Sequence, residues 1–115
     1  MDKIKIKVEL DNKDMNYNYE GIAYINKDII EYRDKDFNYK EYHYLFDKKI
    51  KRLVKSSENT TIILDFLNEE LRVIEDSKEL KMDINVETID INGNNIEIIY
   101  KIANDDIKYV IKEVK

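Results

Sequence analysis

The sequence predicts an all-β domain that closes as an antiparallel up-and-down (meander) β-barrel of eight to ten strands. Apolar residues alternate with charged ones along most of the 115-residue chain, as they do where successive side chains point to opposite faces of a sheet. The breaks between these runs are too short for crossover helices, so neighbouring strands should pair antiparallel. The expected strands are residues 3–10, 15–26, 28–33, 40–46, 49–55, 60–66, 71–75, 80–91, 95–103 and 106–114.

The alternation is clearest at the start of the chain, where Ile4, Ile6 and Val8 are separated by Lys5 and Lys7. It returns over residues 60–66, 80–86, 96–102 and 107–111. An open sheet with this many strands would expose two edges and one bare face, whereas closure removes the edges. A sandwich of two stacked sheets is the alternative arrangement.

Turn residues separate the runs. Asn and Asp tolerate left-handed backbone and suit hairpin loops. The candidate turns are Asn26-Lys27-Asp28, Asp47-Lys48-Lys49, Asn68-Glu69-Glu70, Asp76-Ser77-Lys78, Asn92-Gly93 and Asn104-Asp105-Asp106. The longer polar connection from Arg33 to Tyr39 is expected to be the most mobile loop.

Two irregularities are expected inside strands. Even-numbered positions are apolar from Leu80 to Val86, but the apolar positions are then Ile89 and Ile91. A strand changes face only by taking in an extra residue, which predicts a β-bulge or sharp bend near Thr88. The small Gly21 predicts a second bend.

Composition narrows the classes of function. The length fits one domain, residues 1–115, and the formal net charge of −5 disfavours nucleic acid or an anionic membrane as partner. The chain has no cysteine, which excludes disulfides. The N-terminal segment alternates charge with aliphatics and lacks the apolar core of a secretory signal, so we expect a cytoplasmic protein.

No catalytic or metal-binding constellation stands out, and we expect neither an enzyme nor a cofactor or metal. The single histidine, His43, lies on the opposite strand face from Tyr42 and Tyr44 and is expected at the surface. Paired acids fall in expected turns, where solvated carboxylates are usual: Glu69-Glu70, Glu75-Asp76 and Asp105-Asp106.

Nine tyrosines are many for this length. Their flat rings and hydroxyls suit either a packed core or a cavity for an amphipathic ligand. By alternation the candidate cavity residues are Tyr17, Tyr19, Tyr42, Tyr44, Phe46, Met82 and Tyr100. A single basic run could instead dock a partner or protect a strand edge. Its candidate patch residues are Lys48, Lys49, Lys51, Arg52 and Lys55.

The segment from Tyr19 to Tyr32 resembles an early hairpin of the YwiB-like proteins, which are small bacterial barrels of unknown function in the calycin, or lipocalin-like, superfamily. The closing strands resemble the family on both sides of the Asn92-Gly93 turn. The matching residues are Met82, Ile84, Thr88, Ile91, Ile98 and Tyr100. The resemblance implies a calycin-like fold and the superfamily's habit of binding small apolar molecules.

Two functions follow as hypotheses. The first is a non-enzymatic barrel that binds a small apolar or amphipathic ligand; an eight-stranded barrel either fills itself or holds one such molecule. The second is a protein-interaction module with a filled core, working as a monomer or homodimer through its outer face or a strand edge.

Overall fold

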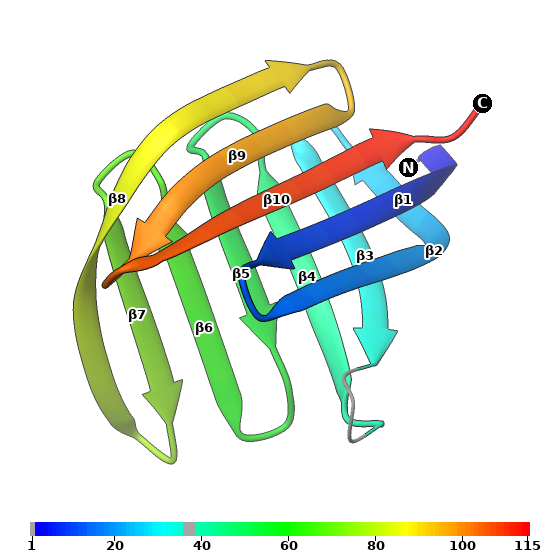
Figure 1. Cartoon of the computed structure of the whole chain (residues 1–115). Helices are drawn as coiled ribbons and strands as arrows, with labels where there is room; N and C mark the ends of the chain where they lie inside the picture. Colours follow the sequence, from blue (N-terminus) through cyan, green and yellow to red (C-terminus); the bar gives the residue numbers. More distant parts are fainter. Residues whose placement is uncertain (1, 36–38) are drawn as a thin grey trace.

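Ten strands follow one another in the computed structural model, which describes residues 2–35 and 39–115 (Figure 1). Each pairs antiparallel with its neighbours in sequence, and β10 pairs with β1, so the sheet closes as a barrel. The strands are β1 (Asp2–Asn12), β2 (Met15–Asn26), β3 (Ile29–Lys35), β4 (Glu41–Asp47), β5 (Arg52–Ser56), β6 (Thr60–Asp65), β7 (Glu70–Glu75), β8 (Lys78–Asn92), β9 (Asn95–Ile102) and β10 (Asp105–Glu113).

The predicted meander barrel is confirmed, and the sandwich alternative is wrong because β1 and β10 are hydrogen-bonded neighbours. The alternation of apolar and charged residues corresponds to inward-facing and outward-facing side chains, as expected. In β1 the side chains of Ile6 and Val8 are buried, and those of Lys5 and Lys7 are exposed. The two terminal strands therefore close the barrel because each presents an apolar face to the same core.

The turns lie at or within a few residues of their predicted positions; Asp105 and Asp106, predicted in a turn, are instead the first residues of β10. The predicted strand over residues 49–55 begins only at Arg52, because the Asp47 carboxylate accepts hydrogen bonds from the backbone N–H groups of Lys49 and Ile50 and holds a longer turn. β3 continues to Lys35, and residues 36–38 of the predicted mobile loop lie outside the described residues.

The predicted bulge in β8 is confirmed. The register with β9 shifts between Val86 and Thr88, so that Glu87 is the extra residue. Ile89 then lies opposite Ile98 and packs against the core. Figure 1 shows β8 bending around the side of the barrel. Its first part pairs with β7 and its second part with β9.

Gly21 has a packing role in addition to the predicted bend, which stays a prediction. The register between β1 and β2 runs unbroken from Asp2 opposite Ile25 to Asn12 opposite Met15, so there is no bulge at Gly21. A Cβ atom on Gly21 would lie 2.0 Å from the Tyr19 hydroxyl oxygen. The glycine therefore makes room for the Tyr19 ring, which lies over its own strand.

Inward-facing side chains of β3 to β8 form rows across the strands, because residues opposite each other in a ladder share a face. One row, here called the closed row, consists of Ile30, Phe46, Leu53, Leu64, Leu71 and Met82. The next, here called the open row, consists of Tyr32, Tyr44, Lys55, Ile62, Val73 and Leu80. The strand ends beyond the open row form the mouth of the barrel, where Asp34 lies opposite Tyr42. The interior thus changes from aliphatic to aromatic and charged along its length.

Candidate functional site

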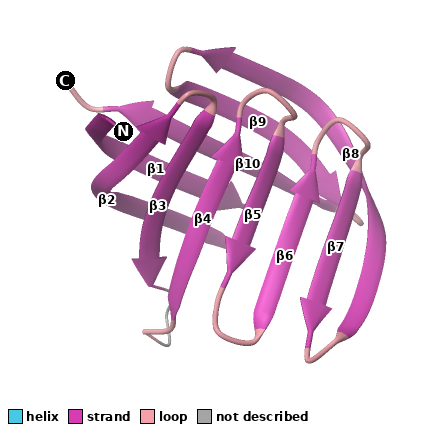
Figure 2. Ribbon diagram, turned by 180° about the vertical axis from the view of Figure 1, so that it is seen from behind, coloured by secondary structure: helices cyan, strands magenta, loops and turns pink. Residues whose placement is uncertain are grey.

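The wall of the barrel opens between β2 and β3. These strands pair only from Ala23 opposite Tyr32 to Asn26 opposite Ile29, although β2 begins at Met15 and β3 continues to Lys35. Figure 2 shows the two strands leaving the shared end in different directions. The separation leaves a cleft of about 570 Å³, here called the β2–β3 cleft. It is lined by Tyr19, Ile22, Tyr24, Glu31, Tyr32 and Arg33.

Stacked tyrosines form the back of the β2–β3 cleft. The ring of Tyr32 lies between those of Tyr19 and Tyr44, with centroid distances of 5.8 Å and 4.7 Å. The planes of Tyr32 and Tyr44 differ by only 3°. Stacked aromatic pairs at these distances are favourable.

A hydroxyl pair anchors the stack to the opposite wall. The hydroxyl oxygens of Tyr32, on β3, and Tyr109, on β10, are 2.6 Å apart and buried. Burial, followed by the neighbouring Tyr109, raises the pKa of Tyr32 well above its ordinary value. Both side chains therefore remain neutral, and their hydrogen bond spans the interior above the mouth.

Charged groups lie at the mouth, next to the tyrosine stack. The Tyr17 hydroxyl donates to the Asp34 carboxylate. The Lys55 ammonium lies 4.3 Å from the ring centroid of Tyr42 and 5.5 Å from that of Tyr44, as cation–π contacts require. Burial raises the pKa of Asp34, although a backbone hydrogen bond from Lys35 and the charge of Lys55 oppose this. A second hollow, of about 380 Å³, shares Tyr19 and Arg33 with the cleft. Its other lining residues are Asp34, Lys35 and Glu41.

The outer rim of the cleft carries paired charges. Arg33 forms an ion pair with Glu41 at 3.2 Å. His43 faces outward, as predicted, and hydrogen-bonds to Glu31 at 2.5 Å. The rim thus combines cationic and anionic groups above an aromatic back wall, which suits a ligand with both flat apolar and polar parts.

The seven predicted cavity residues all lie on the inner face, but they divide into three groups. Phe46 and Tyr100 are buried in the filled part of the core, where Tyr100 meets Phe66 edge-on at 5.2 Å. Met82 is 38% exposed at the side of the barrel. The remaining four gather around the cleft and the mouth: Tyr17, Tyr19, Tyr42 and Tyr44.

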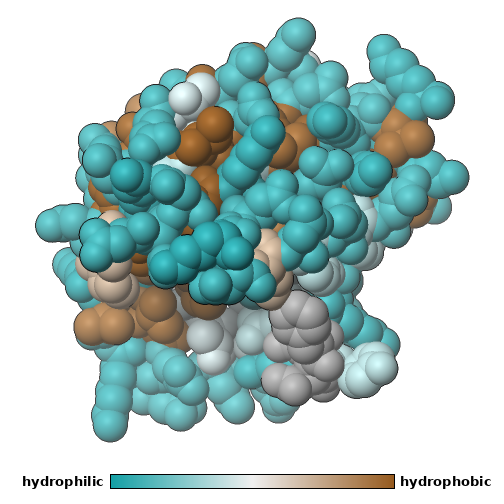
Figure 3. All heavy atoms as spheres, viewed as in Figure 1, coloured by the Kyte–Doolittle hydropathy of each residue, from teal (hydrophilic) through white to brown (hydrophobic). Residues whose placement is uncertain are grey.

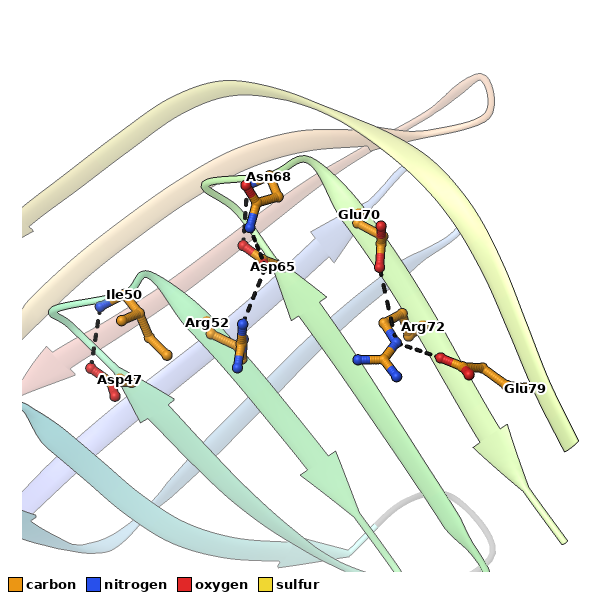
Figure 4. Close-up of polar contacts among 8 residues, drawn as sticks. All are labelled: Asp47, Ile50, Arg52, Asp65, Asn68, Glu70, Arg72 and Glu79. Atoms are coloured by element: carbon orange, nitrogen blue, oxygen red, sulfur yellow. Dashed lines mark hydrogen bonds and ion pairs between the residues drawn. The ribbon is translucent and has the colours of Figure 1, made fainter. Parts of the chain in front are cut away.

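The predicted basic patch is divided by the fold. Lys48, Lys49 and Lys51 lie in the β4–β5 turn, where Lys48 donates to the Gly93 carbonyl and the Asn94 side chain. Arg52 forms an ion pair with Asp65 on the outer face, as Figure 4 shows. Lys55 does not lie with the rest of the predicted patch. It is in the open row, and its ammonium group lies over the rings of Tyr42 and Tyr44.

Sequence reasoning did not select Tyr32, Asp34 or the outward-facing Ile22 and Tyr24. The sequence could have indicated Tyr32 and Asp34, because they follow Ile30 at every second position and so lie on the same inward face. A carboxylate at an inward position marks a place where the core ends or a polar group is needed. No local pattern marks Ile22 and Tyr24, since their place in the cleft depends on where β3 leaves β2.

Within residues 2–35 and 39–115 no three His, Asp or Glu side chains are grouped closely enough to hold a metal ion. In the same part of the chain no helix could cross a membrane. No protein-family model matches the sequence, and no curated protein or solved structure is found to be similar. The resemblance to the YwiB-like barrels remains a prediction.

Proposed function

We propose that the protein is a non-enzymatic binding barrel whose β2–β3 cleft takes a small, flat, amphipathic molecule. The observation that carries the proposal is the stack of Tyr19, Tyr32 and Tyr44 behind an opening of about 570 Å³. Small-molecule sites have volumes of roughly 300–1,000 Å³ and combine aromatic walls with a few polar groups. The proposal places the ligand at the wall of the barrel, since side chains fill the closed row.

The polar groups favour an amphipathic ligand over a purely apolar one. Glu31 and Arg33 line the cleft and are each paired across to β4, with His43 and Glu41. Such partly exposed pairs contribute little to stability. They offer hydrogen-bonding groups to a ligand edge while Tyr19 supports its face.

The first experiment is native mass spectrometry of gently purified protein, followed by a binding titration. A discrete extra mass released on denaturation supports the proposal and gives the ligand class. The titration uses the fluorescent dye 1-anilinonaphthalene-8-sulfonate as a flat amphipathic probe. Replacing Tyr19 by Ala should weaken binding roughly tenfold, since a lost aromatic contact costs about 1–1.5 kcal/mol.

Two variants keep the test specific. Tyr19→Phe retains the ring and should bind nearly as well as the original protein. Leu67→Ala removes an exposed apolar side chain from the β6–β7 turn and controls for non-specific dye binding. Equal dye affinity in Tyr19→Ala and the original protein, with no extra mass, would contradict the proposal.

A second variant displaces the Tyr19 ring without removing it. Gly21→Ala places a methyl group where the Tyr19 hydroxyl now lies and must move the ring. We expect weaker dye binding in this variant, with Ala23→Gly, on the same strand face, as a control for stability changes in β2. Unchanged binding would show that the dye does not use the Tyr19 ring.

A further inference from the structure

The first part of β8, Lys78–Asp83, has only one neighbouring strand among the described residues. It pairs with β7 on one side, whereas pairing with β9 begins at Ile84. All six side chains are exposed, including Leu80 at 59% and Met82 at 38%. Figure 3 shows hydrophobic surface reaching the solvent at the lower left, over β7 and β8. Lys78–Asp83 is here called the β8 edge.

The direction of the backbone groups along the β8 edge follows from one hydrogen bond. The N–H of Ile84 donates to the carbonyl of Glu69, the residue just before β7, at 3.1 Å. Backbone groups alternate in direction along a strand, so even-numbered residues face β7. The N–H and C=O groups of Glu79, Lys81 and Asp83 therefore point to the unpaired side.

The charges of Glu79, Lys81 and Asp83 favour a second copy of this chain as the partner, in one strand register. In an antiparallel pair of β8 edges, outward-pointing residues lie opposite each other. With Leu80 opposite Leu80, Glu79 of each copy lies opposite Lys81 of the other, which places opposite charges together twice. Glu79 is also ion-paired with Arg72 of its own chain, at 2.5 Å. A shift centred on Lys81 would put Lys81 against Lys81 and Glu79 against Asp83, and directly opposed like charges are destabilising.

The remaining register with opposite charges is sterically blocked. Centring on Met82 would put Lys81 against Asp83, but it would also bring Glu79 of the partner against Asn85. The corresponding edge of Asn85 is already paired with Lys101 of β9. One register of the β8 edge therefore fits a second copy in both charge and space.

We propose that two copies of this chain associate through their β8 edges, antiparallel and with Leu80 at the two-fold axis. The edge is self-complementary, as a two-fold interface must be. Pairing covers Leu80 and Met82 and satisfies the outward backbone groups of Glu79 and Lys81. It also removes a long exposed edge, which would otherwise be open to non-specific association.

A charge-swap series measured by analytical ultracentrifugation, from micromolar to millimolar protein, tests the proposal. The original chain should dimerise with rising concentration. Glu79→Lys and Lys81→Glu each place like charges opposite one another twice, and each should weaken the dimer at least tenfold. The double variant restores both opposite-charge pairs and should dimerise as the original chain does, which also shows that loss in the single variants is not misfolding.

The matched control is Lys112→Glu, which changes the net charge as Lys81→Glu does but lies on β10, away from the β8 edge. It should dimerise normally. Amide hydrogen exchange gives an independent readout: protection of Glu79 and Lys81 should rise with concentration, while that of Leu80 and Met82 should not. A chain that stays monomeric, dimers that tolerate Lys81→Glu, or a double variant that fails to recover would overturn the proposal.

Discussion

The closed row and the open row are two residues apart on the same strands, yet their side chains differ in chemistry at β3 to β5. In the closed row Ile30 and Phe46 have no exposed surface. In the open row Lys55 occupies an inward position among aromatic rings. Within one barrel, then, the same paired strands bury apolar side chains at one end of the interior and place charged and aromatic groups at the other.

The pKa values of carboxylates at the two ends of the barrel are also shifted in opposite directions. Asp65, beside the closed row, accepts hydrogen bonds from the backbone and side chain of Asn68 and from Arg52 (Figure 4). Burial alone would raise the pKa of Asp65, but these three donors outweigh it and lower the pKa. Burial dominates at Asp34, in the mouth, and raises its pKa.

The largest expected effect separates the two rows directly. Phe46→Ala should lower the free energy of unfolding by about 3–5 kcal/mol, because it opens a cavity in a fully buried site. Tyr44→Ala should cost less than half as much, since Tyr44 is only partly buried. Urea denaturation followed by circular dichroism measures both. Equal losses would mean that the open row is packed as tightly as the closed row.

The next effect concerns Asp65. Asp65→Ala should cost about 2 kcal/mol at neutral pH, because it removes a turn cap and the partner of Arg52. Since the pKa of Asp65 is lower in the folded state, its contribution is present above about pH 4 and is lost as the pH falls through the folded pKa. Unfolding curves between neutral and acid pH should therefore converge for the variant and the original protein. A constant difference would contradict the assignment.

A smaller effect is expected from the hydroxyl pair that spans the interior. Tyr109→Phe removes one partner and leaves the Tyr32 hydroxyl buried, at a cost of about 1–2 kcal/mol. Adding Tyr32→Phe removes the stranded hydroxyl, so the double variant should be less destabilised than the sum of the two single variants. Thermal or urea unfolding measures the cycle, and strict additivity would show that the two hydroxyls do not interact.

The smallest effect is expected at Asp34, and its sign is opposite to that at Asp65. Because the folded pKa is raised, the stabilising contribution of Asp34 is present below its unfolded pKa and declines as the pH rises through the folded pKa. Asp34→Asn should therefore become relatively more stable, compared with the original protein, as the pH rises from acid toward neutral. The free energies of unfolding of the two proteins, measured across that pH range, give the direction of the change. If Asp34→Asn became relatively less stable as the pH rises, burial could not be the cause of the pKa shift.

Much of the fold could be predicted from local pattern. The alternation of Ile6 and Val8 with lysines identifies strands, and the change of phase between Val86 and Ile89 predicts the bulge that the structure has. Less of the candidate site could be predicted. Tyr19 and Tyr44 were selected, but Tyr32 between them was missed, and Phe46 and Tyr100 were selected although they fill the core.

The sequence by itself determined the class of fold, the approximate strands and the inward face of those strands in which apolar residues alternate, because side-chain direction repeats every two residues and depends only on neighbours along the chain. Tertiary structure alone decided where β3 leaves β2, which inward tyrosines meet solvent, and that the β8 edge lacks a second neighbour. These features depend on the lengths and directions of strands far apart in sequence. No local pattern of residues encodes them, because they arise only when the sheet bends and closes.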